Sequence, residues 1–253
     1  MPKACVLFKP SVAYRRDAFE AGLRRLGYAT VERPLPNPER GDVLVLWNRS
    51  VVDEGHARRY EASGATVLVS ENGYVGKDEQ GHKLFALARG HHNGAGEWLV
   101  GSETRWSSSL DPWRSQGDFL LVLPQRGIGE RGVAMPRDWV GRASSLLRRL
   151  TKRPIRVRPH PGMAKTDPYD ALRGAHAAVT WGSGAGIKAL LAGVPVFYEL
   201  SRWIGAPAGT FLGGADLERP FLGDRLPMFR RLAWAQWSLK EIEGGEAFAW
   251  LLK

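Results

Sequence analysis

A short stretch rich in glycine has the composition of a phosphate-binding turn. Gly182, Gly184 and Gly186 stand at every second position with Ser183 among them, and the apolar run Ala177–Thr180 lies just before them. The run predicts a buried strand, and Ser183 can cap a helix that begins near Gly184. The N–H groups and the positive end of such a helix favour a bound phosphate. The alternative is an ordinary strand–helix connection whose glycines only make the turn flexible.

Basic side chains at the ends of two other predicted strands could neutralise the same phosphate. Arg126 follows the apolar run 119–123, Arg158 ends the run 155–158, and His160 stands between two prolines just beyond it. Arginine binds phosphate oxygens in bidentate fashion, and a histidine held in an extended loop can donate a hydrogen bond to them. A surface salt bridge for each arginine, and a core position for the histidine, are the alternatives.

These side chains can meet only in a fold that brings the ends of several strands together. The predicted strands and helices alternate along the chain, as they do in such folds. We expect strands at 4–8, 29–31, 42–47, 65–69, 119–123, 155–158, 177–180 and 194–197, and helices at 14–26, 57–62, 136–150, 168–172, 184–192, 228–237 and 239–252. This order is typical of doubly wound α/β folds, whose ligands bind beyond the carboxyl ends of the strands. Residues 76–116 predict a Gly- and Trp-rich insertion with a strand or two.

The net charge and the amino-acid composition indicate which binding partners and which cellular compartment to expect. The net charge is +10, which predicts attraction to a polyanion, most commonly nucleic acid and next an anionic membrane surface. Cys5 is the single cysteine, so a disulfide framework is excluded and a reducing compartment is expected. No apolar run is long enough for a signal peptide or a membrane span, so we expect a cytoplasmic protein.

The turn and the histidine loop together resemble known enzymes. The order of strand, Gly-Ser-Gly turn, helix, Gly-Val-Pro and strand up to Phe197 is similar to the C-terminal domain of GT-B-fold glycosyltransferases, where the turn holds the donor pyrophosphate. The segment Pro154–Gly162 resembles the strand and His-Pro loop of capsule-type sugar transferases. The resemblance implies an α/β protein of two Rossmann-like domains with a cleft between them.

This resemblance divides the chain and assigns the donor site. It implies an acceptor domain at 1–116, a nucleotide-sugar domain at 117–226, and terminal helices at 227–253 that cross back to the first domain. Many GT-B enzymes hold the donor ribose with an acidic residue in the helix, where this chain has Lys188. The donor-binding residues that we expect are Arg126, Arg158, His160, Trp181, Ser183, Gly184 and Lys188, with a UDP-sugar as the donor substrate and no separate cofactor.

Sugar transfer with inversion requires a base that deprotonates the acceptor hydroxyl. Glu71 is the first candidate because it directly follows the buried strand 65–69, and His91 and Asp53 are its rivals. Glu71 could equally cap a helix or pair with an arginine. The pair His91-His92 has no acidic or cysteine partner at ligand spacing, so we expect no metal site. The expected acceptor-binding residues are Asn48, Arg49, Asn72, Tyr74, His92 and Asn93.

The sequence therefore predicts a hexosyltransferase-like enzyme whose acceptor is a polyanion. Small phage enzymes that glucosylate hydroxymethylated pyrimidines in duplex DNA share the two-domain fold and a basic cleft, so phage DNA modification in a host cytoplasm is the leading expectation. A capsule or lipopolysaccharide sugar transferase is the second possibility. The third is a non-catalytic GT-B-derived protein that binds nucleotides or DNA.

Overall fold

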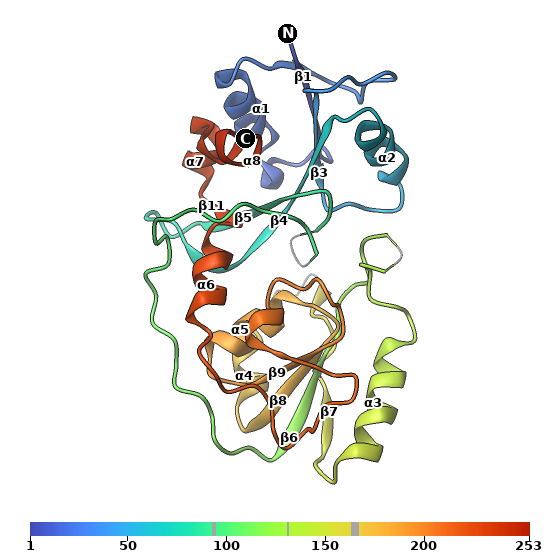
Figure 1. Ribbon diagram of the computed structural model, residues 1–253, viewed down its shortest axis with the longest axis vertical. Helices are drawn as coiled ribbons and strands as arrows, with labels where there is room; N and C mark the ends of the chain where they lie inside the picture. Colours follow the sequence, from blue (N-terminus) through green and yellow to red (C-terminus); the bar gives the residue numbers. More distant parts are fainter. Residues whose placement is uncertain (93–94, 131, 163–166) are drawn as a thin grey trace. The chain divides into compact units, whose positions relative to one another are not determined.

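The computed structural model of the protein describes residues 1–92, 95–130, 132–162 and 167–253, and divides the chain into two compact units (Figure 1). Unit 1 comprises Met1–Glu103, Ile128–Arg131 and Leu232–Lys253, and unit 2 comprises Thr104–Gly127 and Gly132–Arg231. The boundaries expected after residues 116 and 226 compare with boundaries after residues 103 and 231 in the structure, where unit 1 also includes Ile128–Arg131. Each unit contains one sheet.

Unit 1 is built on a six-stranded sheet with the order β11-β5-β4-β3-β1-β2. Its strands are β1 (Lys3–Leu7), β2 (Ala29–Val31), β3 (Val43–Trp47), β4 (Thr66–Lys77), β5 (Lys83–Arg89) and β11 (Gln236–Trp237). The first four are parallel, whereas β5 and β11 are antiparallel to their neighbours. The order reverses between β1 and β3, which makes this strand pair the topological switch point of unit 1.

Helices cover both faces of this sheet because its parallel strands are apolar on both sides. On β3, Val43 and Val45 face the core beneath α1 (Arg16–Arg25), α7 (Leu239–Gly244) and α8 (Glu246–Leu251). Leu44 and Leu46 face the opposite core, which includes Tyr60 of α2 (Glu54–Ala62). Figure 1 shows α1, α7 and α8 on one side of the sheet and α2 on the other. A short 3-10 helix, η1 (Val12–Tyr14), precedes α1.

Two predictions for unit 1 were wrong. The strand expected at 65–69 does not end before Glu71, since β4 continues to Lys77 and pairs with β5 of the predicted insertion. The helix expected at 228–237 ends at Ala233, and Gln236 enters the sheet instead. The buried side chain of Gln236 explains this change: its amide oxygen accepts from the backbone N–H groups of Tyr74 and Val75 at 2.6 and 3.0 Å.

The predicted terminal helix 239–252 is two helices. Gly245 lies between α7 and α8 with φ +94°, a left-handed conformation that ends one helix and starts the next. Ser238 and Glu241 form a capping box at the start of α7.

Unit 2 is built on a five-stranded parallel sheet with the order β10-β9-β8-β6-β7. Its strands are β6 (Phe119–Leu123), β7 (Ile155–Val157), β8 (Ala175–Thr180), β9 (Val196–Tyr198) and β10 (Thr210–Phe211). Its helices are α3 (Trp139–Leu150), α4 (Tyr169–Leu172), α5 (Gly184–Leu191), the 3-10 helix η3 (Ala206–Ala208), and α6 (Leu226–Ala233), which contains the boundary with unit 1. The order reverses between β6 and β8, so their carboxyl ends form the switch point of unit 2.

The amphipathic helix α3 closes the core of unit 2. Trp139, Ala143 and Leu147 follow one another at intervals of four residues and are buried against the sheet residues Leu120 and Val179. The predicted fold class, two Rossmann-like α/β domains, is confirmed. Within the described residues, no helix is both long and apolar enough to cross a membrane.

Candidate functional site

The candidate donor site lies at the switch point of unit 2. Gln125 lies two residues beyond the end of β6, and its side-chain amide donates a hydrogen bond of 3.2 Å to the carbonyl oxygen of Gly182, which follows β8. Thr180, fully buried at the end of β8, donates to the carbonyl oxygen of Leu123 at 3.0 Å. These two bonds hold the ends of β6 and β8 together and fix the turn that leads into α5.

Helix α5 begins at Gly184, and Ser183 caps it, as predicted. The Ser183 hydroxyl accepts from the N–H of Gly186 at 3.3 Å and lies 3.0 Å from the hydroxyl of Thr180, in a buried position. The N–H groups of Gly184 and Ala185 are the first of the helix and have no intrahelical acceptor. The helix N-terminus thus offers backbone N–H groups to an anion, whereas the Ser183 side chain is occupied by capping.

Two of the three glycines are required by packing. A Cβ atom on Gly182 would lie 2.8 Å from Cδ2 of Leu200, and one on Gly186 would lie 2.9 Å from the indole of Trp203. Both contacts are closer than side chains tolerate. At these two positions the missing Cβ atom therefore lets the backbone pack closely against Leu200 and Trp203.

A basic cluster lies beside the switch point. The Nδ1 atom of His160 accepts a hydrogen bond of 3.0 Å from the N–H of Gly162, so a neutral His160 carries its proton on Nε2. Burial, together with the positive charges of Arg126 and Arg158, lowers the pKa of His160 below its ordinary value. Arg126 makes no ion pair with any described residue. An anion bound here would relieve the repulsion between these groups.

The other two predicted donor residues have partners within unit 2. The indole N–H of Trp181 donates to the carbonyl oxygen of Val133 at 2.9 Å, which anchors the segment before α3. The ammonium group of Lys188 lies 3.1 Å from a carboxylate oxygen of Asp167 and faces the ring of Tyr169. Lys188 projects from the second turn of α5, so it can reach an anion only by leaving Asp167.

In unit 1, Arg49 is buried and all five of its N–H donors are bonded. They donate to both carboxylate oxygens of Glu54 and of Glu61 and to the carbonyl oxygen of Gly90, at 2.6–3.1 Å. Burial lowers the pKa of Arg49, but the bonds with Glu54 and Glu61 outweigh burial and raise it above its ordinary value. Arg49 could therefore contact an acceptor only by giving up one of these bonds.

His91 joins the same network through Glu130, a residue that sequence reasoning missed. The Nδ1 atom of His91 forms an ion pair with Glu130, and Nε of Arg49 lies 3.6 Å from the other oxygen of that carboxylate. Burial raises the pKa of Glu130, but His91 and Arg49 outweigh burial and keep it below its ordinary value. His92 is buried. Asn93, also expected to bind the acceptor, lies outside the described residues.

Glu71 is separate from this network. It lies within β4 opposite Ala86 of β5 and accepts a hydrogen bond of 2.8 Å from the hydroxyl of the buried Tyr74. The N–H next to His91, that of Gly90, bonds to the carbonyl oxygen of Val67, four residues before Glu71 on β4. Four residues of strand span about 13 Å, so the two candidate bases are not brought together.

The remaining predicted residues follow β3 or lie within β4. Asp53 accepts a hydrogen bond of 2.5 Å from the hydroxyl of Ser50 at the start of α2. Asn48 has a φ of +56°, and its N–H bonds to the carbonyl oxygen of Ser70. Asn72 is exposed opposite Phe85. Their roles remain predictions.

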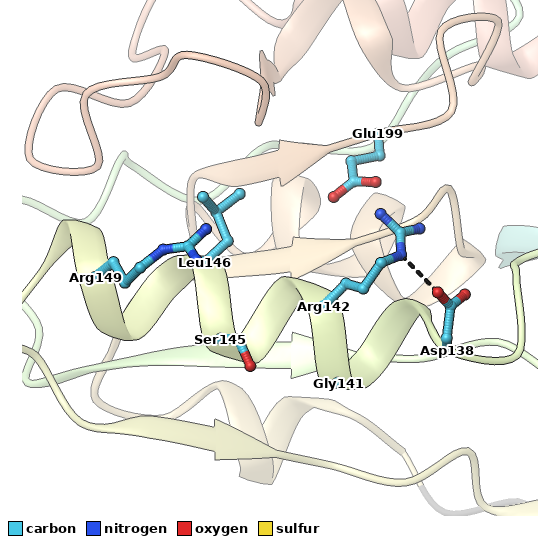
Figure 2. Close-up of a pocket in the computed structure, with 7 residues that line it drawn as sticks. All are labelled: Asp138, Gly141, Arg142, Ser145, Leu146, Arg149 and Glu199. Atoms are coloured by element: carbon cyan, nitrogen blue, oxygen red, sulfur yellow. Dashed lines mark hydrogen bonds and ion pairs between the residues drawn. The ribbon is translucent and has the colours of Figure 1, made fainter.

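A cavity of about 590 Å³ along α3 includes none of the predicted site residues (Figure 2). Arg142, Leu146 and Arg149 of α3 line it together with Glu199, which follows β9. Arg142 bonds to Asp138 at 2.9 Å, and Figure 2 shows the carboxylate of Glu199 turned toward the same guanidinium. Charges of both signs line this cavity, unlike the basic cluster. The described residues hold no group of three His, Cys, Asp or Glu side chains suited to a metal ion.

Gln125 and Glu130 are the residues that sequence reasoning failed to assign. Gln125 had a signal, because it lies two residues beyond a fully buried strand, at the expected ligand edge. Glu130 had none, since its partners Arg49 and His91 are far from it in the sequence.

Comparison with known proteins supports the fold through structure alone. No protein-family model and no curated protein matches the sequence. The chain is similar to the solved structure of Thermosulfurimonas dismutans KpsC, beta Kdo 2,7 transferase, with a TM-score of 0.53, 12% identity, and coverage of 98% of this chain and 99% of that one. It is also similar to the beta Kdo 2,4 transferase of the same organism's KpsC, with a TM-score of 0.50, 14% identity, and coverage of 93% and 90%. The chain has the two-domain, GT-B-like fold of these transferases.

Proposed function

We propose that the protein is a glycosyltransferase that moves a sugar from a nucleotide-activated donor to a hydroxyl group of an acidic glycan. One observation carries the proposal: the N–H groups of Gly184 and Ala185, which the Ser183 cap does not bond, and a basic cluster at His160 flank the switch point of a unit with this fold. Such an edge is where α/β sheets bind ligands, and a helix N-terminus beside basic groups favours phosphate.

The donor phosphate is bound by unit 2 in this proposal. The N–H groups of Gly184 and Ala185, Nε2–H of His160 and the guanidinium of Arg126 donate to its oxygens. Gln125 holds the turn in place from behind. These contacts stabilise the negative charge that develops on the leaving phosphate as its bond to the sugar breaks. UDP remains the expected nucleotide, to be compared with the other nucleoside phosphates.

The acceptor hydroxyl is activated by a residue of unit 1. Glu71 takes the hydroxyl proton, the acceptor oxygen forms a bond to the anomeric carbon, and the bond from that carbon to the donor phosphate breaks. The nucleotide leaves with the electron pair of that bond. The Tyr74 hydroxyl donates a hydrogen bond to one oxygen of Glu71 and so holds the carboxylate in position.

An acidic capsule- or lipopolysaccharide-type glycan is the acceptor that we favour. Both structural neighbours are Kdo transferases, and the net charge of +10 suits an acidic sugar chain. Hydroxymethylated pyrimidines in duplex DNA are supported only by the same charge, so we place them second.

A thermal-shift titration followed by a transfer assay tests the proposal. A bound donor raises the melting temperature by mass action, so nucleotides, nucleotide sugars and nucleotide-activated Kdo are compared first. Transfer of labelled sugar to a Kdo oligosaccharide supports the proposal, and transfer to hydroxymethylated duplex DNA alone supports the second acceptor. Nucleotide binding with neither transfer nor donor hydrolysis would leave a non-catalytic binding protein.

A further inference from the structure

An aromatic cluster lies at the switch point of unit 1. Phe8 directly follows β1 and Trp47 ends β3, and their rings are 5.6 Å apart. Tyr14, from η1, lies 4.6 Å from Trp47 with its ring tilted by 43°. Phe85 of β5 contacts the same indole edge-to-face at 6.0 Å. Trp47 and Tyr14 thus form a platform at an edge where α/β sheets bind ligands.

The polar tips of this platform are open. Trp47 and Tyr14 are only partly buried. Neither the indole N–H of Trp47 nor the hydroxyl of Tyr14 is bonded to a described residue, and neither is among the buried polar atoms. The indoles of Trp113, Trp181 and Trp250, in contrast, all donate to backbone carbonyls. A ligand on the platform would therefore find an aromatic face with two free hydrogen-bonding groups at its rim.

The backbone beside the platform is strained. Among the described residues, Arg15 and Asn48 alone have positive φ without being glycine, at +49° and +56°. They directly follow Tyr14 and Trp47. Left-handed conformations cost free energy in most residues and concentrate at functional sites, where they aim particular side chains. Here each of them stands immediately after an aromatic residue of the platform.

We propose that Trp47 and Tyr14 bind a sugar ring of the acceptor, an inference that rests on the proposed function. The apolar C–H face of a pyranose packs on an aromatic face, and the indole N–H donates to a sugar hydroxyl or ring oxygen. A nucleobase also stacks on aromatic rings, but it packs flat and makes less use of an N–H at the rim. Asn72, on the same sheet face opposite Phe85, supplies a further polar group near the platform.

The first test separates the two halves of the reaction. Trp47→Phe keeps an aromatic ring and removes the N–H, and we expect it to raise KM for a Kdo disaccharide acceptor roughly three- to tenfold with little change in kcat. Trp47→Ala should raise KM roughly ten- to a hundredfold. Trp250→Phe is the matched control, because it also removes one indole N–H in unit 1, at a residue stacked on Trp234. Donor affinity, read by thermal shift, shows that each variant is folded.

The second test does not depend on transfer. The full chain labelled with 5-fluorotryptophan is titrated with the same disaccharide, and Trp47→Phe identifies the Trp47 resonance. A shift of that resonance supports the platform even if no transfer is found, in which case only the proposed function fails. Transfer with a stationary Trp47 resonance and wild-type KM in Trp47→Phe would overturn the platform and leave the function standing. A shift with hydroxymethylcytidine but not with the disaccharide would assign the platform to a nucleobase.

Discussion

The side-chain amide of Gln125 and the carbonyl oxygen of Gly182 are joined by a hydrogen bond of 3.2 Å between the two strand ends where the sheet of unit 2 reverses its order. Together with the bond from Thr180 to the carbonyl oxygen of Leu123, it fixes the path of the turn that enters α5. The direction of the helix N-terminus, and so of its free N–H groups, is thus determined by two side chains of neighbouring strands. Five predictions test this site and the candidate residues of unit 1.

Gly184→Val should abolish donor binding without unfolding the protein. A branched side chain at the first residue of α5 would occupy the space in front of the N–H groups that hold the phosphate. Nucleotide affinity is measured by calorimetry, with the melting temperature as a check of folding. Gly141→Val is the matched control, because Gly141 is also helical and a Cβ there meets no atom within 4 Å. Unchanged nucleotide affinity in a folded Gly184→Val variant would contradict the assignment.

His160 should titrate below 6.5, its ordinary pKa, in the free protein. Its depressed pKa means that the folded state resists protonation, so its contribution to stability is complete above 6.5 and is lost as the pH falls through the folded-state pKa. The unfolding free energy of His160→Gln should therefore decline less between pH 7 and pH 5 than that of the wild type.

Removal of a neighbouring charge tests the cause of this shift. Arg126→Gln should move the His160 pKa, followed by NMR, upward toward its ordinary value, because one of the two repelling guanidinium groups is gone. Added pyrophosphate should move it in the same direction in the wild type. If the pKa of His160 changes neither in Arg126→Gln nor on addition of pyrophosphate, Arg126 is not part of the phosphate site.

Arg49→Ala should destabilise the protein by about 3 kcal/mol, because the carboxylates of Glu54 and Glu61 lose the guanidinium that binds both. Arg58→Ala removes an exposed partner of Glu54 and should cost less than about 1 kcal/mol. Urea unfolding followed by circular dichroism measures both. Equal effects of the two substitutions would show that Arg49 is not the structural centre of this network.

Glu71→Gln should lower transfer by about two to four powers of ten, the usual contribution of a general base, with donor affinity nearly intact. Glu79→Gln, on the exposed turn between β4 and β5, is the control and should transfer normally. Turnover of the donor with a Kdo oligosaccharide is the measurement. If Glu71→Gln retains near-normal turnover, His91 and then Asp53 become the candidates.

The sequence by itself determined the order of most strands and helices and the start of α5. Near-continuous apolar runs predict buried parallel strands because only such residues fit between two helical layers, and Ser183 before glycine predicts a capped helix because both signals are local. Because these signals are local, the prediction of a helix at residues 228–237 was wrong at its end. There Gln236 belongs to β11, since its side chain bonds to the backbone of Tyr74 and Val75, about 160 residues away.

Only the tertiary structure decided which polar residues are available to a ligand. Arg49 and His91 are residue types that often bind ligands. In this structure, however, Arg49 is bonded to Glu54 and Glu61, and His91 is paired with Glu130. Tryptophan is typically a core residue. Trp47, however, stands at the end of β3 just before the left-handed Asn48, and its indole N–H is not bonded to a described residue. Whether a polar group is paired depends on which residues, distant in the sequence, the fold brings next to it. The residues adjacent in the sequence do not indicate these contacts.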